Sequence, residues 1–235
     1  MSEFINTIDV LGDDAVIDSI IQRDITEFAD NTVQTFGDCS FYGCTELTSV
    51  DAPACTEVRS NAFNKCTALT KINLPALTTV YAAAFGICTS LESVELPLVR
   101  NFSGGGQFQD CTALKSLKLP LWESGTTGYE FRRCSALVSA DFFKAKSFRG
   151  QTFLDCTALK SLILRNTEAV CSLGNVNVLQ STPIADGAGY VYVPKTLVDS
   201  YKAATNWSTY ADQFRALEDY TVDGTITGEL DETKI

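Results

Sequence analysis

The 235-residue sequence contains no histidine and no Cys-x-x-Cys pair. Zinc sites are built mainly from such pairs or from Cys with His, so we expect no metal. Cysteine and serine nucleophiles usually need a positioned base, most often His. The sequence leaves a Ser-Lys dyad or a carboxylate pair open, but no motif singles one out. We therefore expect no enzymatic activity and no cofactor.

The sequence also lacks a long apolar run. No stretch approaches the roughly 18 apolar residues of a membrane-spanning helix. The N-terminus has neither the basic region nor the unbroken apolar segment of a signal peptide. We expect a soluble protein without membrane insertion. Its localisation stays open, because a chain trimmed of its signal would look the same.

Basic residues are scarce at the two ends of the chain. The formal net charge is -11, of which residues 1–24 and 217–235 contribute -5 each. An acidic protein repels nucleic acid and anionic membranes, so neither is an expected partner. Residues 100–165 hold ten Lys or Arg against five Asp or Glu. We interpret this basic segment as a solvated surface rather than an anion-binding patch.

A motif recurs along the chain at intervals of 22, 22, 23, 23 and 22 residues. Each copy has a Phe, a Cys three residues later and a Leu three residues after that. Six matches at four or more fixed positions predict a repeat architecture. The copies are FYGCTELTSVDAP from Phe41, FNKCTALTKINLP from Phe63, FGICTSLESVELP from Phe85, FQDCTALKSLKLP from Phe108, FRRCSALVSADFF from Phe131 and FLDCTALKSLILR from Phe153.

Each copy predicts one strand and one short helical segment. The second half alternates apolar and polar residues, as around Ile72, and a Pro such as Pro75 ends the strand in the first four copies. The first half, as in SNAFNKC, suits one or two helical turns that place Phe and Cys on one face. The fold class is therefore an α/β leucine-rich repeat solenoid with a curved parallel sheet, short helical segments on its convex side and a cap at each end.

Two features vary between copies. An apolar residue stands five positions before the Phe in the early copies, as at Val58 and Val80, and copies four and five lose it. The glycine run of Gly104 to Gly106 lacks the Lys-Ser/Thr of a phosphate loop, so we interpret it as a lengthened turn.

The motif resembles the BspA-like leucine-rich repeat family, whose unit has the form Cys-x-x-Leu-x-x-Ile-x-Leu-Pro followed by Ala-Phe-x-x-Cys. The resemblance covers about residues 25–165 and is most specific in the first four copies. It implies a protein of bacterial surfaces, or one encoded by phage or prophage. It also implies a closing cap, because Tyr-Val-Pro, Tyr-Lys-Ala-Ala and Asn-Trp segments end many such arrays.

The expected organisation has four parts. Residues 1–24 form an N-terminal helical cap, with Val16, Ile17, Ile20 and Ile21 on one stripe. Residues 25–165 form the array, and residues 166–216 form a degenerate repeat and a strand-helix cap whose aromatics are core. Residues 217–235 are an acidic tail that is a strand, a hairpin or frayed.

Nine cysteines have to be placed in this fold. Helical segments of neighbouring coils pack roughly 8 to 10 Å apart, which exceeds the ~7 Å limit between the Cα atoms of a disulfide. We expect the six motif cysteines to be free thiols that fill small core sites. Cys39, Cys55 and Cys171 remain open as candidates for a bridge. The Thr or Ser after each motif Cys is expected to hydrogen-bond the backbone.

The strand residues between the apolar positions should form the open face of the sheet. We expect a protein or glycan partner to bind there, in a non-enzymatic recognition or adhesion module. One alternative is a structural or assembly component, for example of a virion, and another is that the exposed serines are simply benign. The candidate binding residues are Ser49, Asp51, Lys71, Asn73, Ser93, Glu95, Ser116, Lys118, Ser139 and Asp141.

Overall fold

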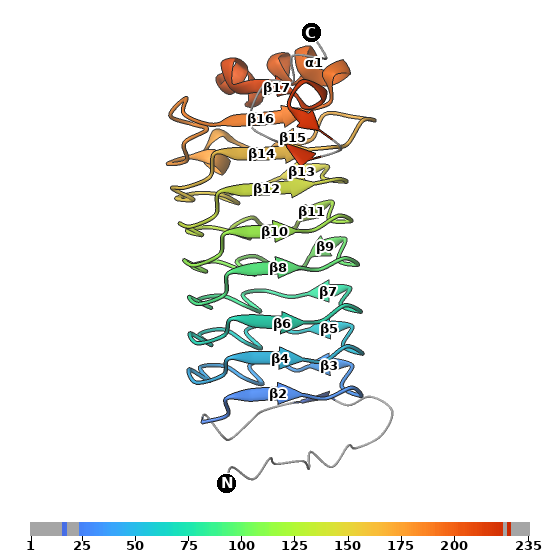
Figure 1. The fold of residues 1–235 in the computed structure, drawn as a ribbon, viewed down its shortest axis with the longest axis vertical. Coiled ribbons are helices and arrows are strands. Elements are labelled where there is room, and N and C mark those ends of the chain that lie inside the picture. Colours follow the sequence, from blue (N-terminus) through green and yellow to red (C-terminus); the bar gives the residue numbers. More distant parts are fainter. Residues whose placement is uncertain (1–15, 18–23, 223–224, 227–235) are drawn as a thin grey trace.

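The computed structural model describes residues 16–17, 24–222 and 225–226, and it shows a stack of coils with parallel strands on two sides (Figure 1). The sides are called the front sheet and the back sheet. The front strands are β2 (Glu27–Ala29), β4 (Ser49–Asp51), β6 (Lys71–Asn73), β8 (Ser93–Glu95), β10 (Ser116–Lys118), β12 (Ser139–Phe142), β14 (Ser161–Leu164), β16 (Tyr190–Val193) and β17 (Phe214–Ala216). The back strands are β1 (Val16–Ile17), β3 (Thr35–Phe36), β5 (Glu57–Val58), β7 (Thr79–Val80), β9 (Asn101–Phe102), β11 (Ser124–Gly125), β13 (Ser147–Phe148) and β15 (Ser172–Leu173).

The front strands lie where the repeat predicts them, in the predicted register. Val94 pairs with Leu117, and Leu117 pairs with Ala140. All three are buried, because alternate residues of a strand point to opposite faces and this face covers the core. The leucine-rich repeat solenoid is thus confirmed.

The expected helical turns of the repeats are not formed. SNAFNKC is a run of turns, with Asn61 at φ 57° and Lys65 at φ 65°, and left-handed residues cannot continue an α-helix. The N–H groups of these turns bond the next coil instead: Asn61 donates to Ala82 O (2.9 Å) and Phe63 to Ala84 O (2.8 Å). Each turn is therefore held by its neighbouring coils.

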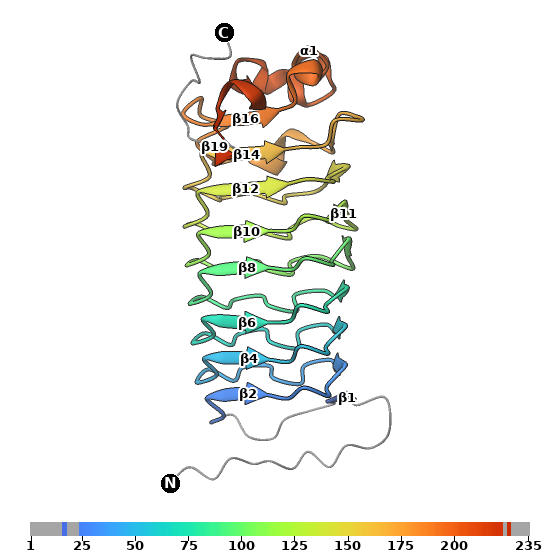
Figure 2. The same cartoon turned by 45° about the vertical axis from the view of Figure 1, so that its right-hand side comes forward.

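The back sheet replaces the predicted convex helices. Residues of the expected apolar column, such as Val58 and Val80, lie in its strands and are fully buried. Both sides of a coil thus have the spacing of paired strands, roughly 4.8 Å. Equal spacing explains why the coils stack along a nearly straight axis rather than a pronounced curve (Figures 1 and 2). It also shows that the 8 to 10 Å separation expected for neighbouring motif cysteines is wrong.

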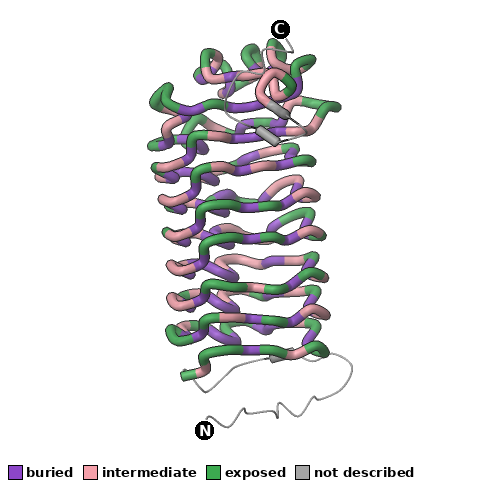
Figure 3. The backbone as a smooth tube through the Cα atoms, in the orientation of Figure 1, coloured by how far each residue is buried: buried purple, intermediate pink, exposed green. Residues whose placement is uncertain are grey.

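The core is built from columns of like residues that run through the stack, inside coils whose burial alternates along the chain (Figure 3). The motif Phe rings are fully buried and stack face to face, with centroids 5.4 Å apart for Phe63 and Phe85 and 5.2 Å apart for Phe85 and Phe108. Each such aromatic pair adds about 0.5–1.5 kcal/mol beyond its burial. The column therefore couples each coil to the next.

The apolar back column is not lost in copy four, where the spacing predicted its loss, whereas in copy five a glycine stands in its place. Phe102 pairs with Val80 and is fully buried, because one extra residue separates it from Phe108. Gly125 pairs with Phe102, and a Cβ there would lie 1.7 Å from Glu130 Oε1. The side chain of Glu130 thus occupies the space that Val or Phe fills in other coils.

The glycine run is a turn that follows β9. A Cβ on Gly104 would lie 2.7 Å from Ala82 Cβ, and one on Gly105 would lie 2.4 Å from Gly128 O. Glycine is required there because the backbones of successive coils approach closely.

At the N-terminal end, Val16 and Ile17 form strand β1, which pairs with β3 and extends the back sheet. These two residues are therefore extended rather than helical, because the ladder of β3 supplies their hydrogen-bond partners. The rest of the expected N-terminal helical cap, including Ile20 and Ile21, lies outside the described residues.

The C-terminal end is closed by strand β16, as predicted, and by short helices. These are the 3-10 helices η1 (Val176–Leu179), η2 (Lys195–Leu197), η3 (Trp207–Gln213) and η4 (Leu217–Asp219), with α1 (Val198–Ala203). Trp207 Nε1 donates to Cys171 O (2.6 Å), and Tyr201 Oη accepts from Cys171 N (2.8 Å). Trp207 and Tyr201 are fully buried, so both act as core and cover the edge strand β15.

Beyond Tyr220, strands β18 (Thr221–Val222) and β19 (Thr225–Ile226) form an antiparallel hairpin. It lies in front of the C-terminal end of the front sheet (Figures 1 and 2). Of the alternatives open for the acidic tail, the structure shows a hairpin for these residues.

Candidate functional site

The outward face of the front sheet carries all ten candidate binding residues. Seven of them are exposed, whereas Ser49, Ser139 and Asp141 are half-buried. They form two parallel columns, because equivalent residues pair across the strands, as Ser93 does with Ser116. The face is thus the flat polar surface that the repeat predicts.

The front sheet is divided into two hydrogen-bonded blocks. One contains β2, β4 and β6, and the other runs from β8 to β17. Ile72 in β6 is partly exposed, whereas its counterparts Val50 and Val94 are buried. Four candidates, Ser49, Asp51, Lys71 and Asn73, therefore belong to the first block, and the other six belong to the second.

Charged candidates are paired along the stack. Asn73 Nδ2 donates to Asp51 Oδ1 (2.7 Å), and Lys118 Nζ donates to Glu95 Oε1 (2.7 Å). Lys118 and Glu95 side chains are more than 60% exposed, so this ion pair contributes little to stability. Its main effect is to hold opposite charges in fixed order on the face.

An arginine side chain is fixed at the C-terminal part of the face. Arg165 donates from Nε and Nη2 to both carboxylate oxygens of Asp141, at 2.8 to 3.0 Å. Its guanidinium also lies 5.0 Å from the ring centroid of Phe143, which is 46% exposed. Asp141, a predicted residue, is thus part of an exposed cluster of an aromatic ring and a forked ion pair.

A second aromatic and arginine pair lies two strands farther along the sheet. The Arg215 guanidinium lies 4.2 Å from the ring centroid of Tyr190, and Arg215 Nη1 donates to Asp212 O and Phe214 O. Tyr190 is 38% exposed. We call Phe143, Arg165, Tyr190 and Arg215, with Asp141, the aromatic–arginine cluster.

Sequence reasoning missed four of the five cluster residues. Tyr190 and Arg215 belong to the predicted cap of residues 166–216, outside the repeated motif. The register of β14, β16 and β17 places Arg215 beside Tyr192 and Tyr190 beside Ser161, so the Tyr190–Arg215 pair and the Phe143–Arg165 pair lie on either side of Ile163 and Tyr192. The replacement of Pro by Phe143 and Arg165 in copies five and six was the available signal.

The hairpin end of the chain covers the apolar middle of this region. Ile163 and Tyr192 are outward residues, yet they are 5% and 3% exposed. Tyr220 packs edge-to-face on Tyr192 with ring centroids 5.5 Å apart. Burial and the neighbouring tyrosines raise the pKa of Tyr192. The cluster therefore borders a covered apolar site.

None of the described cysteines is in a disulfide, so the three candidates for a bridge, Cys39, Cys55 and Cys171, are unbridged. Motif cysteines donate to the Phe carbonyl of the preceding coil, as Cys66 Sγ does to Phe41 O (3.1 Å). Burial raises the pKa of the Cys66 thiol to about 12 and that of Cys55 to about 11. Such thiols stay neutral and are poor nucleophiles.

The hydroxyls that follow the motif cysteines partly behave as expected. Thr89 and Thr157 bond the carbonyl of the equivalent residue in the preceding coil, at 3.4 and 3.5 Å. Tighter bonds of this type come from other columns, such as Thr70 Oγ1 to Thr48 O at 3.1 Å. These hydroxyls are used in stacking the coils.

Glu130 is the buried carboxyl of the described residues, at 1% exposure. Its Oε2 lies 2.8 Å from Thr152 Oγ1, and its Oε1 accepts from Gly128 N (3.1 Å). Burial raises the pKa of Glu130. Because Glu130 is sealed in the core, it fills space rather than forming an accessible site.

The described residues form neither a metal site nor a membrane-spanning helix. Within residues 16–17, 24–222 and 225–226, no three His, Cys, Asp or Glu side chains are placed to hold a metal ion. In the same part of the chain, no helix is long and apolar enough to cross a membrane.

Known proteins resemble this chain in fold. The solved structure of a leucine-rich repeat protein from T. pallidum aligns with a TM-score of 0.61 and 23% identity, covering 82% of this chain and 89% of that one. A leucine-rich cell surface protein from Faecalibacterium prausnitzii A2-165 aligns with a TM-score of 0.46 and 19% identity, covering 72% and 60%. The pneumococcal vaccine antigen PcpA aligns with a TM-score of 0.47 and 16% identity, covering 82% and 40%. This chain thus spans less than two thirds of the last two.

Curated proteins give no match to the chain. The family model described as BspA type leucine rich repeat region matches residues 22–121 and 104–181, in six copies. These ranges include all six motif copies and most of the described coils. The chain therefore belongs to the BspA type leucine-rich repeat family.

Proposed function

We propose that this chain is a non-enzymatic recognition module that binds a macromolecular partner, a protein or a glycan, through the outward face of the front sheet. Within each of its two blocks, the strands of this face are held by coil-to-coil hydrogen bonds, so each block is a rigid platform. Little ordering of the backbone is needed when a partner docks, which favours affinity.

The aromatic–arginine cluster carries this proposal. Binding energy at protein interfaces is concentrated in a few Tyr, Trp and Arg residues, surrounded by polar contacts that exclude water. Here Phe143 and Tyr190 are exposed, and Arg165 and Arg215 lie against their rings. The polar columns continue from the cluster over the rest of the second block.

Four exposed apolar side chains offer a matched test. Phe143 (46% exposed) and Tyr190 (38%) lie at the front face, whereas Leu98 (44%) and Tyr42 (39%) lie outside it. The double variants Phe143→Ala/Tyr190→Ala and Leu98→Ala/Tyr42→Ala would be compared with the unchanged chain on panels of purified extracellular matrix proteins and arrayed glycans. We expect at least a tenfold loss of affinity for the front-face variant alone. If it binds as the unchanged chain does, front-face recognition is wrong.

A bacterial surface or virion setting is part of the same proposal. It rests on the resemblance to BspA-like proteins. Protease shaving of intact cells that express the chain, compared with fractionation of phage particles, distinguishes these settings. Recovery only from the cell interior would contradict both.

A further inference from the structure

Four cations gather on the C-terminal half of the back sheet. Arg100 and Lys146 immediately precede β9 and β13, and each ion-pairs with Glu123, which precedes β11. The Lys146 ammonium, with the charges of Arg100 and Lys144, lowers the pKa of the Glu123 carboxyl. One carboxylate therefore lies among three cations, and two of these charges are left uncompensated.

Arg149 adds a fourth exposed cation at the other end of β13. It follows the strand pair of Ser147 and Phe148, and its side chain is outward and exposed. Three residues of extended chain separate it from Lys146, roughly 10 Å. Arg100 lies two coils from Lys146, again roughly 10 Å. The side chains of Arg100 and Lys146 converge on the one carboxylate of Glu123, so it is the separation of this group from Arg149 that exceeds the span of a single carboxylate or phosphate and suits an extended ligand.

Hydroxyl and amide groups fill the area between the cations. Asn101, Ser124, Ser147 and Ser172 are paired in register on the outward face of β9, β11, β13 and β15. Ser124 Oγ donates to Asn101 Oδ1 (3.1 Å), which fixes both side chains. None of the large exposed apolar side chains of the described residues stands at these outward strand positions. The surface therefore offers hydrogen bonds and charge, without the apolar anchors typical of a protein partner.

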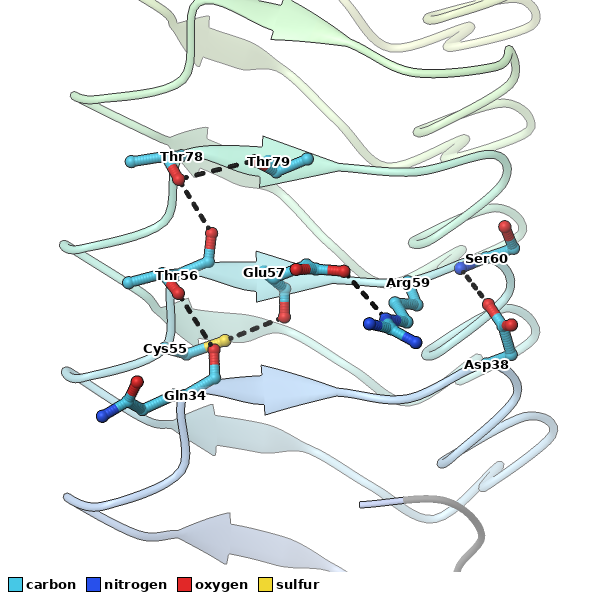
Figure 4. Close-up of polar contacts among 9 residues, drawn as sticks. All are labelled: Gln34, Asp38, Cys55, Thr56, Glu57, Arg59, Ser60, Thr78 and Thr79. Atoms are coloured by element: carbon cyan, nitrogen blue, oxygen red, sulfur yellow. Dashed lines mark hydrogen bonds and ion pairs between the residues drawn. The ribbon is translucent and has the colours of Figure 1, made fainter. Parts of the chain in front are cut away.

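Among the described residues, the N-terminal half of the same sheet has no excess of cations. There Arg59 Nε donates to Glu57 Oε1 (2.8 Å), and Thr56 and Thr78 bond the backbone of the preceding coil (Figure 4). Ser60 N donates to Asp38 Oδ1 (2.8 Å). The excess of cations is thus confined to coils four to six. The repeat alone does not explain this excess of cations, because the repeat runs through every coil and the excess does not.

We propose that this surface, the outward face of β9, β11, β13 and β15 with Arg100, Lys144, Lys146 and Arg149, binds an acidic polysaccharide. Its anionic groups pair with the four cations, and the guanidinium groups of Arg100 and Arg149 donate forked pairs of hydrogen bonds to its carboxylates. Its sugar hydroxyls bond the Ser and Asn ladder. We call this surface the basic strip. It is distinct from the front-face site and stands or falls independently of it.

Isothermal titration of the full chain with polygalacturonate tests the proposal. The charge reversal Lys146→Glu/Arg149→Glu should weaken binding at least tenfold. The control Lys65→Glu/Lys202→Glu makes the same change in net charge at exposed positions outside the strip and should weaken binding less than threefold. Lys146→Gln/Arg149→Gln removes the charges at similar size, and circular dichroism verifies the fold of each variant.

Two further arms separate the chemistry of the ligand. Ser124→Ala/Ser147→Ala keeps every charge and should weaken binding several-fold, because a sugar uses these hydroxyls whereas simple ion exchange does not. Poly-glutamate of equal charge should bind more weakly than polygalacturonate. Equal losses in the strip and control variants, unchanged binding in the serine variant, tighter binding of poly-glutamate or no binding at low ionic strength would each overturn the proposal.

Discussion

The packing of Gly125 against Glu130 predicts a strong coupling between two positions of one coil. In coils two and three the equivalent pairs are Val58 with Ala62 and Val80 with Ala84. In coil five the large side chain is that of Glu130, at the position of Ala62 and Ala84, and Gly125 stands where Val58 and Val80 do. A Cβ added at Gly125 would lie 1.7 Å from Glu130 Oε1 and 2.6 Å from Glu130 Cδ. The three nearest heavy atoms all belong to Glu130, so this side chain is the main obstacle to a substitution.

The expected free energies follow from this geometry. Gly125→Ala forces the buried carboxyl aside and should cost about 1–3 kcal/mol. Glu130→Ala removes one buried methylene, about 0.8 kcal/mol, together with the buried carboxyl, and leaves Gly128 N without its acceptor, so we expect a loss of about 2–3 kcal/mol. In the double variant the new methyl group enters vacated space. The double variant should therefore be no less stable than Glu130→Ala alone. The coupling free energy between the two substitutions is then about 1–3 kcal/mol.

Urea unfolding followed by circular dichroism measures all four proteins of this cycle. The control cycle combines Glu130→Ala with Gly43→Ala, four coils away, where a Cβ meets no atom within 4 Å. Distant substitutions add within about 0.5 kcal/mol, and the control should do so. If the losses of unfolding free energy in Gly125→Ala and Glu130→Ala add within that limit, the two side chains do not compete for the same space and the reasoning is refuted.

Three further predictions concern ionisation, strain and thiols. Burial raises the folded-state pKa of Glu130, so the contribution of this side chain to stability is full below its unfolded pKa of about 4.3 and is lost as pH rises through the folded pKa. The free energy of unfolding of Glu130→Gln minus that of the unchanged chain should therefore grow above about pH 4. A difference that stays constant with pH in urea titrations would contradict this. Gly43→Ala should cost about 1 kcal/mol in the same assay, because Gly43 has φ 72° with free space around it, and an unchanged stability would show that the turn relaxes. Dithionitrobenzoate should titrate nine thiols in denatured, unreduced protein, with the exposed Cys39 reacting first in the native state. A count below nine would reveal a disulfide and contradict the structure.

The sequence predicts the front half of each coil well, because period-two alternation and the Cys and Leu positions define one register. Ile72, Val94 and Leu117 follow this pattern, and their polar neighbours face outward. The back half is harder to predict. Its strands, such as Glu57–Val58, have two residues, too few to show alternation.

The predicted helices fail for a related reason. Phe and Cys three residues apart share a face in a helix, but a stack of turns also puts them on one side. Lys65 and Ile87 adopt left-handed φ although neither residue favours it, since bonds to the neighbouring coils hold the turn. Such bonds join residues about 22 positions apart, which propensities for local structure do not include.

The candidate site could be predicted from the sequence only where it lies within the repeat. Ser93 and Ser116 lie in the repeat, and their placement follows from the register. The cation–π contact between Arg215 and Tyr190 depends on how the cap strands β16 and β17 join the sheet. No repeat constrains that junction, so the cluster emerges only from the tertiary structure.

The turn column gives the solenoid an electrical polarity. Phe63 N–H donates to Ala84 O, and the peptide that carries this oxygen also carries Phe85 N–H, which donates to Gln107 O. The chain continues in the same sense through Phe108, Phe131 and Phe153 to Val178 O. Peptide dipoles therefore add head to tail across coils as they do along a helix, with positive ends toward the C-terminus. Copies of this chain that stack end to end should accordingly favour head-to-tail over head-to-head order.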